Sequence, residues 1–268
     1  MAIKFPQGLP VIPRWLVIAL LVFSVFFIFL RISSCSENSR NDLVVGNLGG
    51  VPVEIPRAYT RFVEYNQASS FLEYISAVFL KRSYDSKLRG FAFETRYPDM
   101  ASAEVKTKAD EDIFSTMWMR VLIDSGENYG SSGDEALENH KKWYLDKRHT
   151  CLSRNKCFVY IPLPDKTFGL TGYTPTGTGV DESLRNINGG LGTDYRDRNI
   201  YFYQDEAGRV MTFVVCGNRT HGAERCEQYF NLNPVMKAHV KVNYRKELLP
   251  HWQKIQSSVT KLIYSFEY

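Results

Sequence analysis

The cysteines are the residues whose spacing points most directly to chemistry. The five cysteines are Cys35, Cys151, Cys157, Cys216 and Cys226. The last four form two local pairs, Cys151 with Cys157 and Cys216 with Cys226. Neither pair is a Cys-x-x-Cys motif, so the spacing of a zinc knuckle is missing. We predict two short-loop disulfides, Cys151–Cys157 and Cys216–Cys226. Two alternatives stay open: two pairs of buried free thiols, or a metal site that includes His221, between Cys216 and Cys226.

The other polar residues show no catalytic pattern. Residues 130–133 read Gly-Ser-Ser-Gly, which lacks the Gly-x-Ser-x-Gly spacing of a serine hydrolase elbow. The five histidines form no His-Glu-x-x-His motif, and no phosphate loop with its lysine is present. The acids at Asp194, Asp197, Asp205 and Glu206 are typical of solvated turns. We predict a protein that is not an enzyme and has no metal or cofactor; an enzyme of unrecognised type is the alternative.

The charge distribution argues against nucleic-acid binding. The net charge is +4 from 33 basic and 29 acidic residues. Three of the basic residues, Lys4, Arg14 and Arg31, lie in the first 35 residues, which contain no acid. The rest of the chain therefore has 30 basic and 29 acidic groups, and such a balance gives no electrostatic attraction for a polyanion.

Residues 15–30 are an uncharged apolar run between Arg14 and Arg31. A spanning helix needs about 20 such residues, with a lower limit near 17, so this run is slightly short. We predict a membrane anchor within residues 1–35, a linker at 36–42 and a folded domain at 43–268. Residues 32–35, Ile-Ser-Ser-Cys, resemble a lipoprotein box, so lipidation of Cys35 is the alternative, although Arg31 is atypical there.

The predicted disulfides indicate on which side of the membrane the folded domain lies. Basic residues flank the apolar run on both sides, so they do not orient it. Disulfides persist in oxidising compartments, which places the domain beyond the membrane. The expected location is the bacterial inner membrane, single-pass, with the domain in the periplasm; a lipoprotein is the alternative.

The elements that would position these residues are mainly strands. Alternating apolar residues predict strands at 50–56, 62–65, 91–97, 117–124 and 167–174. Residues 199–204 and 210–216 flank a turn at 205–209 and predict a hairpin, and strands follow at 227–232 and 237–244. Helical periodicity is present at 70–81, 134–147 and 248–266. We therefore predict an α+β fold of antiparallel sheets with a few packed helices, with two similar halves, 43–150 and 151–268, as one arrangement.

A long Gly-rich stretch, residues 175–198, is the segment most typical of a binding loop. Loops of this length are uncommon without a role, and aromatic and arginine side chains are the usual anchors of protein interfaces. We predict that a partner contacts Tyr173, Tyr195, Arg196 and Arg198, although an ordinary surface loop would have the same composition.

Several stretches resemble one family of bacterial envelope proteins. They are residues 46–57, 62–66, 89–100, 116–124, 226–230 and 241–263. These stretches are similar to periplasmic immunity proteins encoded beside lipase effectors of type VI secretion systems. The resemblance implies a tethered protein that occludes a toxic phospholipase, and it carries over no functional residue. A structural or assembly protein of the envelope is the alternative function.

Overall fold

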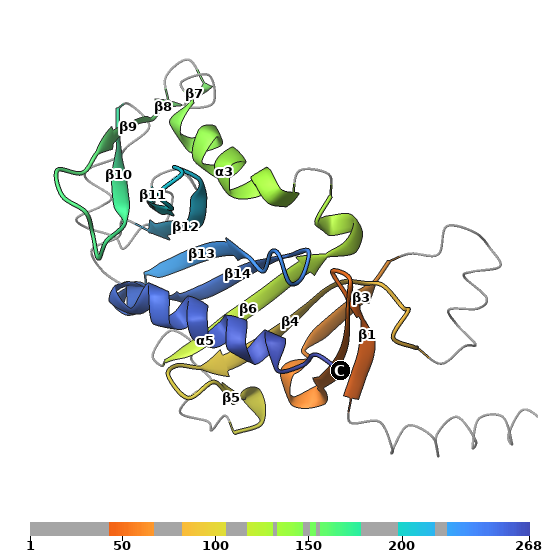
Figure 1. The fold of residues 1–268 in the computed structure, drawn as a ribbon. Helices are drawn as coiled ribbons and strands as arrows, with labels where there is room; N and C mark the ends of the chain where they lie inside the picture. Colours follow the sequence, from red (N-terminus) through yellow and green to blue (C-terminus); the bar gives the residue numbers. More distant parts are fainter. Residues whose placement is uncertain are drawn as a thin grey trace, which may run out of the picture. The chain divides into compact units, whose positions relative to one another are not determined.

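Antiparallel pairing joins most of the described strands of the unit Leu43–Tyr268 into one ten-stranded sheet (Figure 1). This computed structural model describes residues 43–66, 82–105, 117–130, 133–146, 151–153, 156–177, 198–217 and 224–268. In their order across the sheet the strands are β3 (Phe62–Tyr65), β4 (Leu88–Arg96), β6 (Trp118–Ser125), β14 (Ala238–Arg245), β13 (Arg225–Asn231), β12 (Val210–Gly217), β11 (Arg198–Gln204), β10 (Thr171–Thr176) and β9 (Val159–Pro162), with β5 (Ala101–Ser102) beside β4.

The other elements among the described residues are two hairpins and two α-helices. They are β1 (Leu43–Leu48) with β2 (Val51–Pro56), β7 (Cys151–Ser153) with β8 (Lys156–Cys157), α3 (Ala136–Leu145) and α5 (Trp252–Tyr264). Short 3-10 segments lie at Arg57–Tyr59, Ala103–Val105, Gly126–Asn128, Gly133–Glu135 and Lys246–His251. The predicted α+β class with antiparallel pairing is confirmed.

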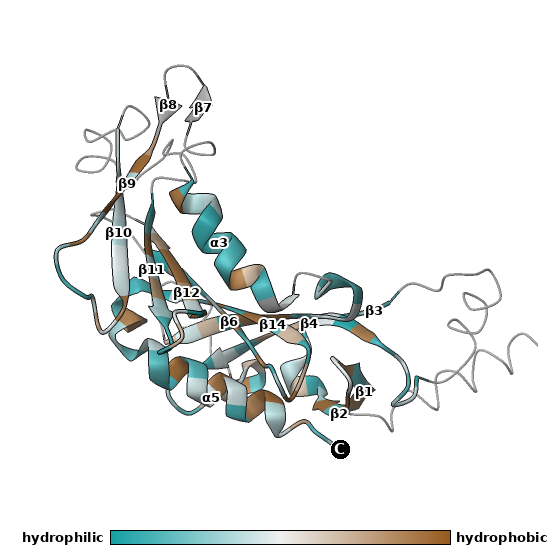
Figure 2. Cartoon of the chain, turned by 45° about the horizontal axis from the view of Figure 1, so that its top comes forward, coloured by the Kyte–Doolittle hydropathy of each residue, from teal (hydrophilic) through white to brown (hydrophobic). Residues whose placement is uncertain are grey.

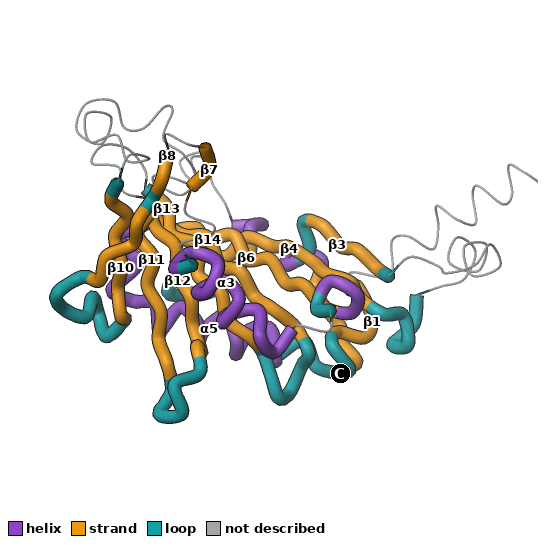
Figure 3. Tube along the Cα trace, turned by 90° about the horizontal axis from the view of Figure 1, so that it is seen from above, coloured by secondary structure: helices purple, strands orange, loops and turns teal. Residues whose placement is uncertain are grey.

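One continuous sheet crosses both of the halves considered from the sequence. Strand β6 comes from residues before 150 and pairs with β14 from the end of the chain, with Val121 opposite Val242. Figure 3 shows the strands side by side from β3 to β10. The centre of the sheet therefore depends on a pairing between segments more than a hundred residues apart in sequence.

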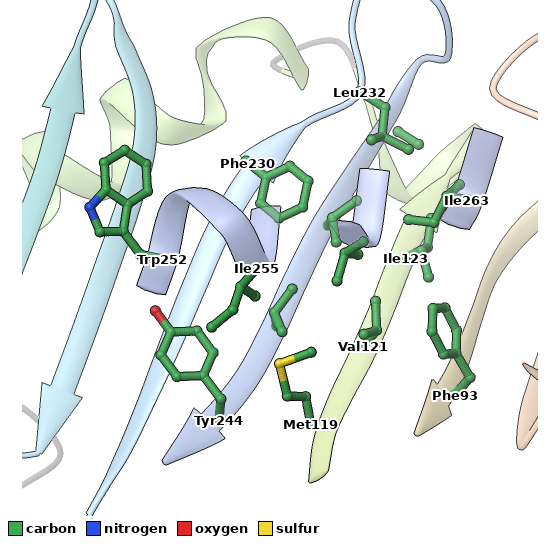
Figure 4. Packing of buried hydrophobic residues seen from close by; sticks show 14 of the residues in the cluster. Phe93, Met119, Val121, Ile123, Phe230, Leu232, Tyr244, Trp252, Ile255 and Ile263 are labelled. Carbon is green, nitrogen blue, oxygen red and sulfur yellow. The ribbon is translucent and has the colours of Figure 1, made fainter. Parts of the chain in front are cut away.

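Helix α5 closes the main core against one face of this sheet. Its apolar residues recur every three or four positions, which places Ile255, Val259 and Ile263 on one side of the helix, and all three are fully buried. Figure 4 shows this side of α5 packed on residues such as Phe93, Met119, Val121, Ile123 and Phe230. Each fully buried aliphatic side chain contributes about 1.5–3 kcal/mol, so the helix is an integral part of the core.

The β1–β2 hairpin and the C-terminus hold each other in place. Gly49 and Gly50 have φ of 59° and 102°, a conformation that favours glycine. The amide of Lys237 donates to the Gly49 carbonyl at 2.9 Å, and a Cβ on Gly49 would lie 2.5 Å from the same amide nitrogen. Glu54 donates its amide to the Phe266 carbonyl at 2.8 Å. The end of α5 is thereby fixed to a hairpin whose first strand the sequence pattern did not predict.

The disulfide Cys216–Cys226 joins β12 to β13, as predicted. The two cysteines are register partners, and both are fully buried on the α5 side of the sheet. The alternative of free thiols at this pair is therefore excluded. Cys151 and Cys157 are also register partners, in β7 and β8, and the disulfide between them stays a prediction.

Two predicted elements differ from the structure. The strand expected at 167–174 begins only at Thr171, because Thr167 and Leu170 close a tight turn through Phe168 and Gly169, both with positive φ. Strand β9 was not predicted, since Pro162 ends it after four residues. The closing helix expected at 248–266 is a 3-10 turn as far as His251 and α-helical from Trp252.

The predicted membrane location needs a correction. Across the part of the chain that the structure describes, no helix has both the length and the apolar character needed to cross a membrane. On this finding, the expected single-pass placement in the inner membrane is wrong. The apolar run 15–30, Cys35, the linker 36–42 and the helix expected at 70–81 lie outside the described residues.

Candidate partner-binding site

Helix α3 lies on the face of the sheet opposite α5 (Figure 2). Successive side chains of a strand point to opposite faces. In β12, Val214 and Cys216 therefore join the α5 core, whereas Phe213 and Val215 pack in a second cluster with Leu137 of α3. This second cluster also contains Ile200, Phe202 and Val210, and it seats the helix over β11 and β12.

Specific contacts fix the position of α3 on the sheet. Glu138 accepts a hydrogen bond from the backbone amide of Val210 at 2.9 Å, which attaches the helix to the first residue of β12. Before the helix, Gly133 packs directly on the ring of Tyr129, and a Cβ at Gly133 would lie 2.0 Å from a ring carbon. The helix position is therefore set by its contacts with the sheet and with the preceding turn.

A groove rich in aromatic residues runs along α3. It has a volume of about 500 Å³. We call it the aromatic groove, and its walls are Ala136, Asn139, His140, Trp143, Tyr144, Val215 and Tyr229. Trp143, Tyr144 and Tyr229 are each half-buried, so their rings combine a supported position with surface that a partner can cover. Tryptophan and tyrosine are the residue types that contribute most often to binding hot spots.

His140 is held between two rings at the base of the groove. Its ring centroid lies 5.6 Å from that of Phe213 and 4.8 Å from that of Tyr229. Burial, and then the positive charge of Lys241, lower the pKa of His140 below its ordinary value of 6.5. The imidazole is therefore neutral at neutral pH, and its role is packing rather than charge.

A charged cluster forms one rim of the aromatic groove. Glu227 accepts hydrogen bonds from the Tyr229 hydroxyl at 2.5 Å and from Lys241 Nζ at 2.8 Å, and Arg198 Nη1 lies 3.4 Å from its other oxygen. Burial alone would raise the pKa of Glu227, but the hydrogen bonds from Lys241 and Tyr229 and the nearby cations lower it. The carboxylate is ionised at neutral pH and holds Arg198, Lys241 and Tyr229 in fixed positions.

Two of the four residues predicted to contact a partner lie on this face. Tyr173 of β10 stacks on Phe202 with a centroid distance of 5.8 Å, and Arg198 belongs to the charged rim. Tyr195 and Arg196 lie outside the described residues. For all four residues, including Tyr173 and Arg198, the role of partner contact stays a prediction.

Sequence reasoning missed most of the groove. The helical pattern at 134–147 predicted the helix, but it gave no sign that His140 would contact Tyr229 or that Trp143 would line the same groove. The contact between His140 and Tyr229 forms only in the tertiary structure, where α3 packs over β12 and β13. Only the alternation of β13, which places Glu227 and Tyr229 on one face, was readable in advance.

The comparisons with known proteins bear on the fold. No protein-family model and no curated protein matches the chain. One similar solved structure is an immunity protein of the Stenotrophomonas maltophilia type IV secretion system, with a TM-score of 0.51 and 15% identity over 85% of this chain and 94% of that protein. The chain has the fold of that immunity protein. The resemblance seen in the sequence is thus supported at the level of the fold, while the similar protein belongs to a type IV system and not to a type VI system.

The metal site considered from the sequence is not formed by the residues proposed for it. Cys216 and Cys226 are joined in a disulfide, so neither offers a thiolate to a metal. His221 lies outside the described residues. Within the ranges that are described, no three His, Cys, Asp or Glu side chains gather as metal ligands.

Proposed function

We propose that this chain is an immunity protein that binds a secreted protein toxin through the aromatic groove and blocks its action. The observation that carries the proposal is the groove itself, in which Trp143, Tyr144 and Tyr229 stand on a rigid sheet beside a charged rim. An inhibitor of this kind needs no nucleophile, because it acts by covering the toxin. It needs aromatic anchors whose positions are fixed before binding, which limits the entropy lost on association.

The fold and the disulfide support this assignment. The similar structure is described as an immunity protein of a secretion system. The Cys216–Cys226 disulfide is a bond that persists in oxidising compartments, where a secreted toxin would meet its antagonist. The finer proposal, from the sequence resemblance, is that the toxin is a lipase effector of a type VI secretion system.

The rim would give the groove its specificity. Arg198 and Lys241 are held by Glu227 at the edge of an apolar surface, where they can pair with carboxylates of the toxin at little cost in ordering. Aromatic contacts would then supply most of the affinity and the rim would fix the orientation of the partner.

A binding experiment tests the proposal with matched variants. The full chain is titrated by calorimetry with the toxin encoded beside its gene, and a lipase effector of the type VI class is tested in parallel. Trp143→Ala should weaken toxin binding by about 2 kcal/mol or more, roughly thirtyfold. Tyr203→Ala is the control, because Tyr203 is an exposed tyrosine of β11 that contacts Trp252 on the α5 side; it should leave the affinity within about twofold.

The outcomes separate the coarse proposal from the fine one. Binding to a toxin that is not a lipase would retain the immunity function and reject the lipase assignment. Equal losses from the two variants would place the interface elsewhere. Failure of every secreted toxin of the source genome to bind would reject the immunity function.

A further inference from the structure

A second polar site lies on the same face of the sheet as α3, at the end where β6 and β13 begin and β14 ends. It is a small cavity of about 30 Å³. We call it the arginine cavity, and its walls are Trp118, Arg120, Arg225, Asn243, Tyr244 and Arg245. Three of its lining residues are arginines and none is an acid. This composition distinguishes it from the aromatic groove, with which it shares no lining residue.

The strand register brings these cations together. Arg225 lies directly opposite Arg245 in the pairing of β13 with β14, and Asn243 lies opposite Arg120 in the pairing of β14 with β6. Like charges at directly opposed positions destabilise a sheet. Glu247, which pairs with Arg245, offsets part of this repulsion, and a further negative group between the two strands would reduce it more.

Two buried donors in the cavity have no acceptor among the described residues. Arg120 Nη2 donates to Glu94 at 3.2 Å, and Arg245 Nη2 donates to Glu247 at 3.1 Å. The Nε–H groups of both arginines are buried and make no hydrogen bond. Buried polar groups of this kind are rare in native proteins and call for an explanation such as an absent water or ion. Here two such donors occur on neighbouring strands in the lining of one cavity.

We propose that the arginine cavity binds a single carboxylate group. A planar carboxylate accepts several hydrogen bonds at once and matches the geometry in which guanidinium groups donate them. A volume of about 30 Å³ admits one such group or a water and is too small for a whole metabolite. The carboxylate is supplied either by a small organic acid or by an Asp or Glu side chain of a protein partner.

Side-chain NMR of the full chain labelled with ¹⁵N-arginine tests the site directly. Sodium acetate is the probe, and sodium chloride at equal ionic strength is the reference. The Nε–H signals of Arg120 and Arg245 should move together and saturate with one dissociation constant. Arg209 is the internal control: it pairs with Asp205 on an exposed turn and its side chain is 75% exposed, so its signal should not saturate.

Two substitutions refine the same measurement. Arg245→Lys keeps the positive charge and removes the Nε–H donor, and it should weaken acetate binding about tenfold, as expected for a lost charge-assisted hydrogen bond. Arg120→Lys is a second variant with the same expectation. Thermal unfolding of each variant checks that the fold is retained. If a variant does not fold, the titration of the wild-type chain still tests the site.

The source of the carboxylate is distinguished by a second arm. The two lysine variants are titrated with the toxin that binds the wild-type chain. Acetate binding together with a loss of toxin affinity assigns the site to a partner side chain, and acetate binding alone assigns it to a free organic acid. Arginine Nε–H signals that do not saturate with acetate, or that respond equally to chloride, would overturn the proposal; neither result bears on the aromatic groove.

Discussion

Removal of the Cys216–Cys226 disulfide should reduce both the stability of the domain and the order of the aromatic groove. The two cysteines are register partners in β12 and β13. Their immediate neighbours Val215 and Glu227 are also register partners, and they point to the α3 face. The covalent link on one face therefore fixes the strand pair that carries one wall and the rim of the groove on the other.

The expected loss follows from the length of the loop that the disulfide closes. The cysteines are 10 residues apart, and closing such a loop in the unfolded chain corresponds to about 3 kcal/mol at 25 °C in the chain-entropy model. For a domain of this size that free energy is equivalent to a fall in Tm of about 6–12 °C. Replacing both buried sulfurs by hydrogen adds a smaller packing loss.

The assay is urea unfolding of the full chain and of the Cys216→Ala/Cys226→Ala double variant. The double variant should unfold at lower urea with a larger m-value, because the chain without the link exposes more surface when unfolded. Its affinity for the toxin should also fall. A loss of stability below about 1 kcal/mol with an unchanged m-value would refute the view that this link holds β12 and β13 in register.

Three further predictions concern single side chains. Glu138→Ala leaves the amide of Val210 without its acceptor and should lower the free energy of unfolding by about 1–3 kcal/mol, against no change for Glu206→Ala on an exposed turn. Burial lowers the pKa of His140 in the folded state, so the unfolded chain binds a proton at this residue more readily than the folded chain does. The free energy of unfolding should therefore be highest above pH 6.5 and should fall as the pH drops below that value. His140→Asn should flatten this part of the pH profile in urea titrations. Ile263→Ala should cost about 2–5 kcal/mol, whereas Leu43→Ala on an exposed position should cost little.

The strands and the closing helix could be predicted because their patterns are local. In β14 the residues Val240 and Val242 alternate with His239 and Lys241, and the buried and half-buried positions follow the same alternation. The helical periodicity at 248–266 was also readable, and Ile255, Val259 and Ile263 are fully buried at that spacing.

The sites could not be predicted, because each depends on which strands become neighbours. Arg225 and Arg245 are 20 positions apart in sequence, and their opposition follows from the register of β13 and β14. Trp143 and Tyr229 line one groove only because α3 packs across β12. Composition could show that arginines and aromatic residues were present, but it could not show which of them share a cavity.

The division of the sheet into two faces explains why binding is expected on one of them. On one face, the apolar side of α5 packs against the sheet and is buried in the main core, so this part of the face is not available to a partner. The α3 face carries the aromatic groove and the arginine cavity, and these adjoin through Glu227 at the rim and its register partner Asn243 in the cavity wall. A partner seated on Tyr229 would lie four residues along β13 from Arg225, which is roughly 13 Å. The arrangement combines an apolar anchor with a directional carboxylate contact, so that affinity and orientation come from different residues.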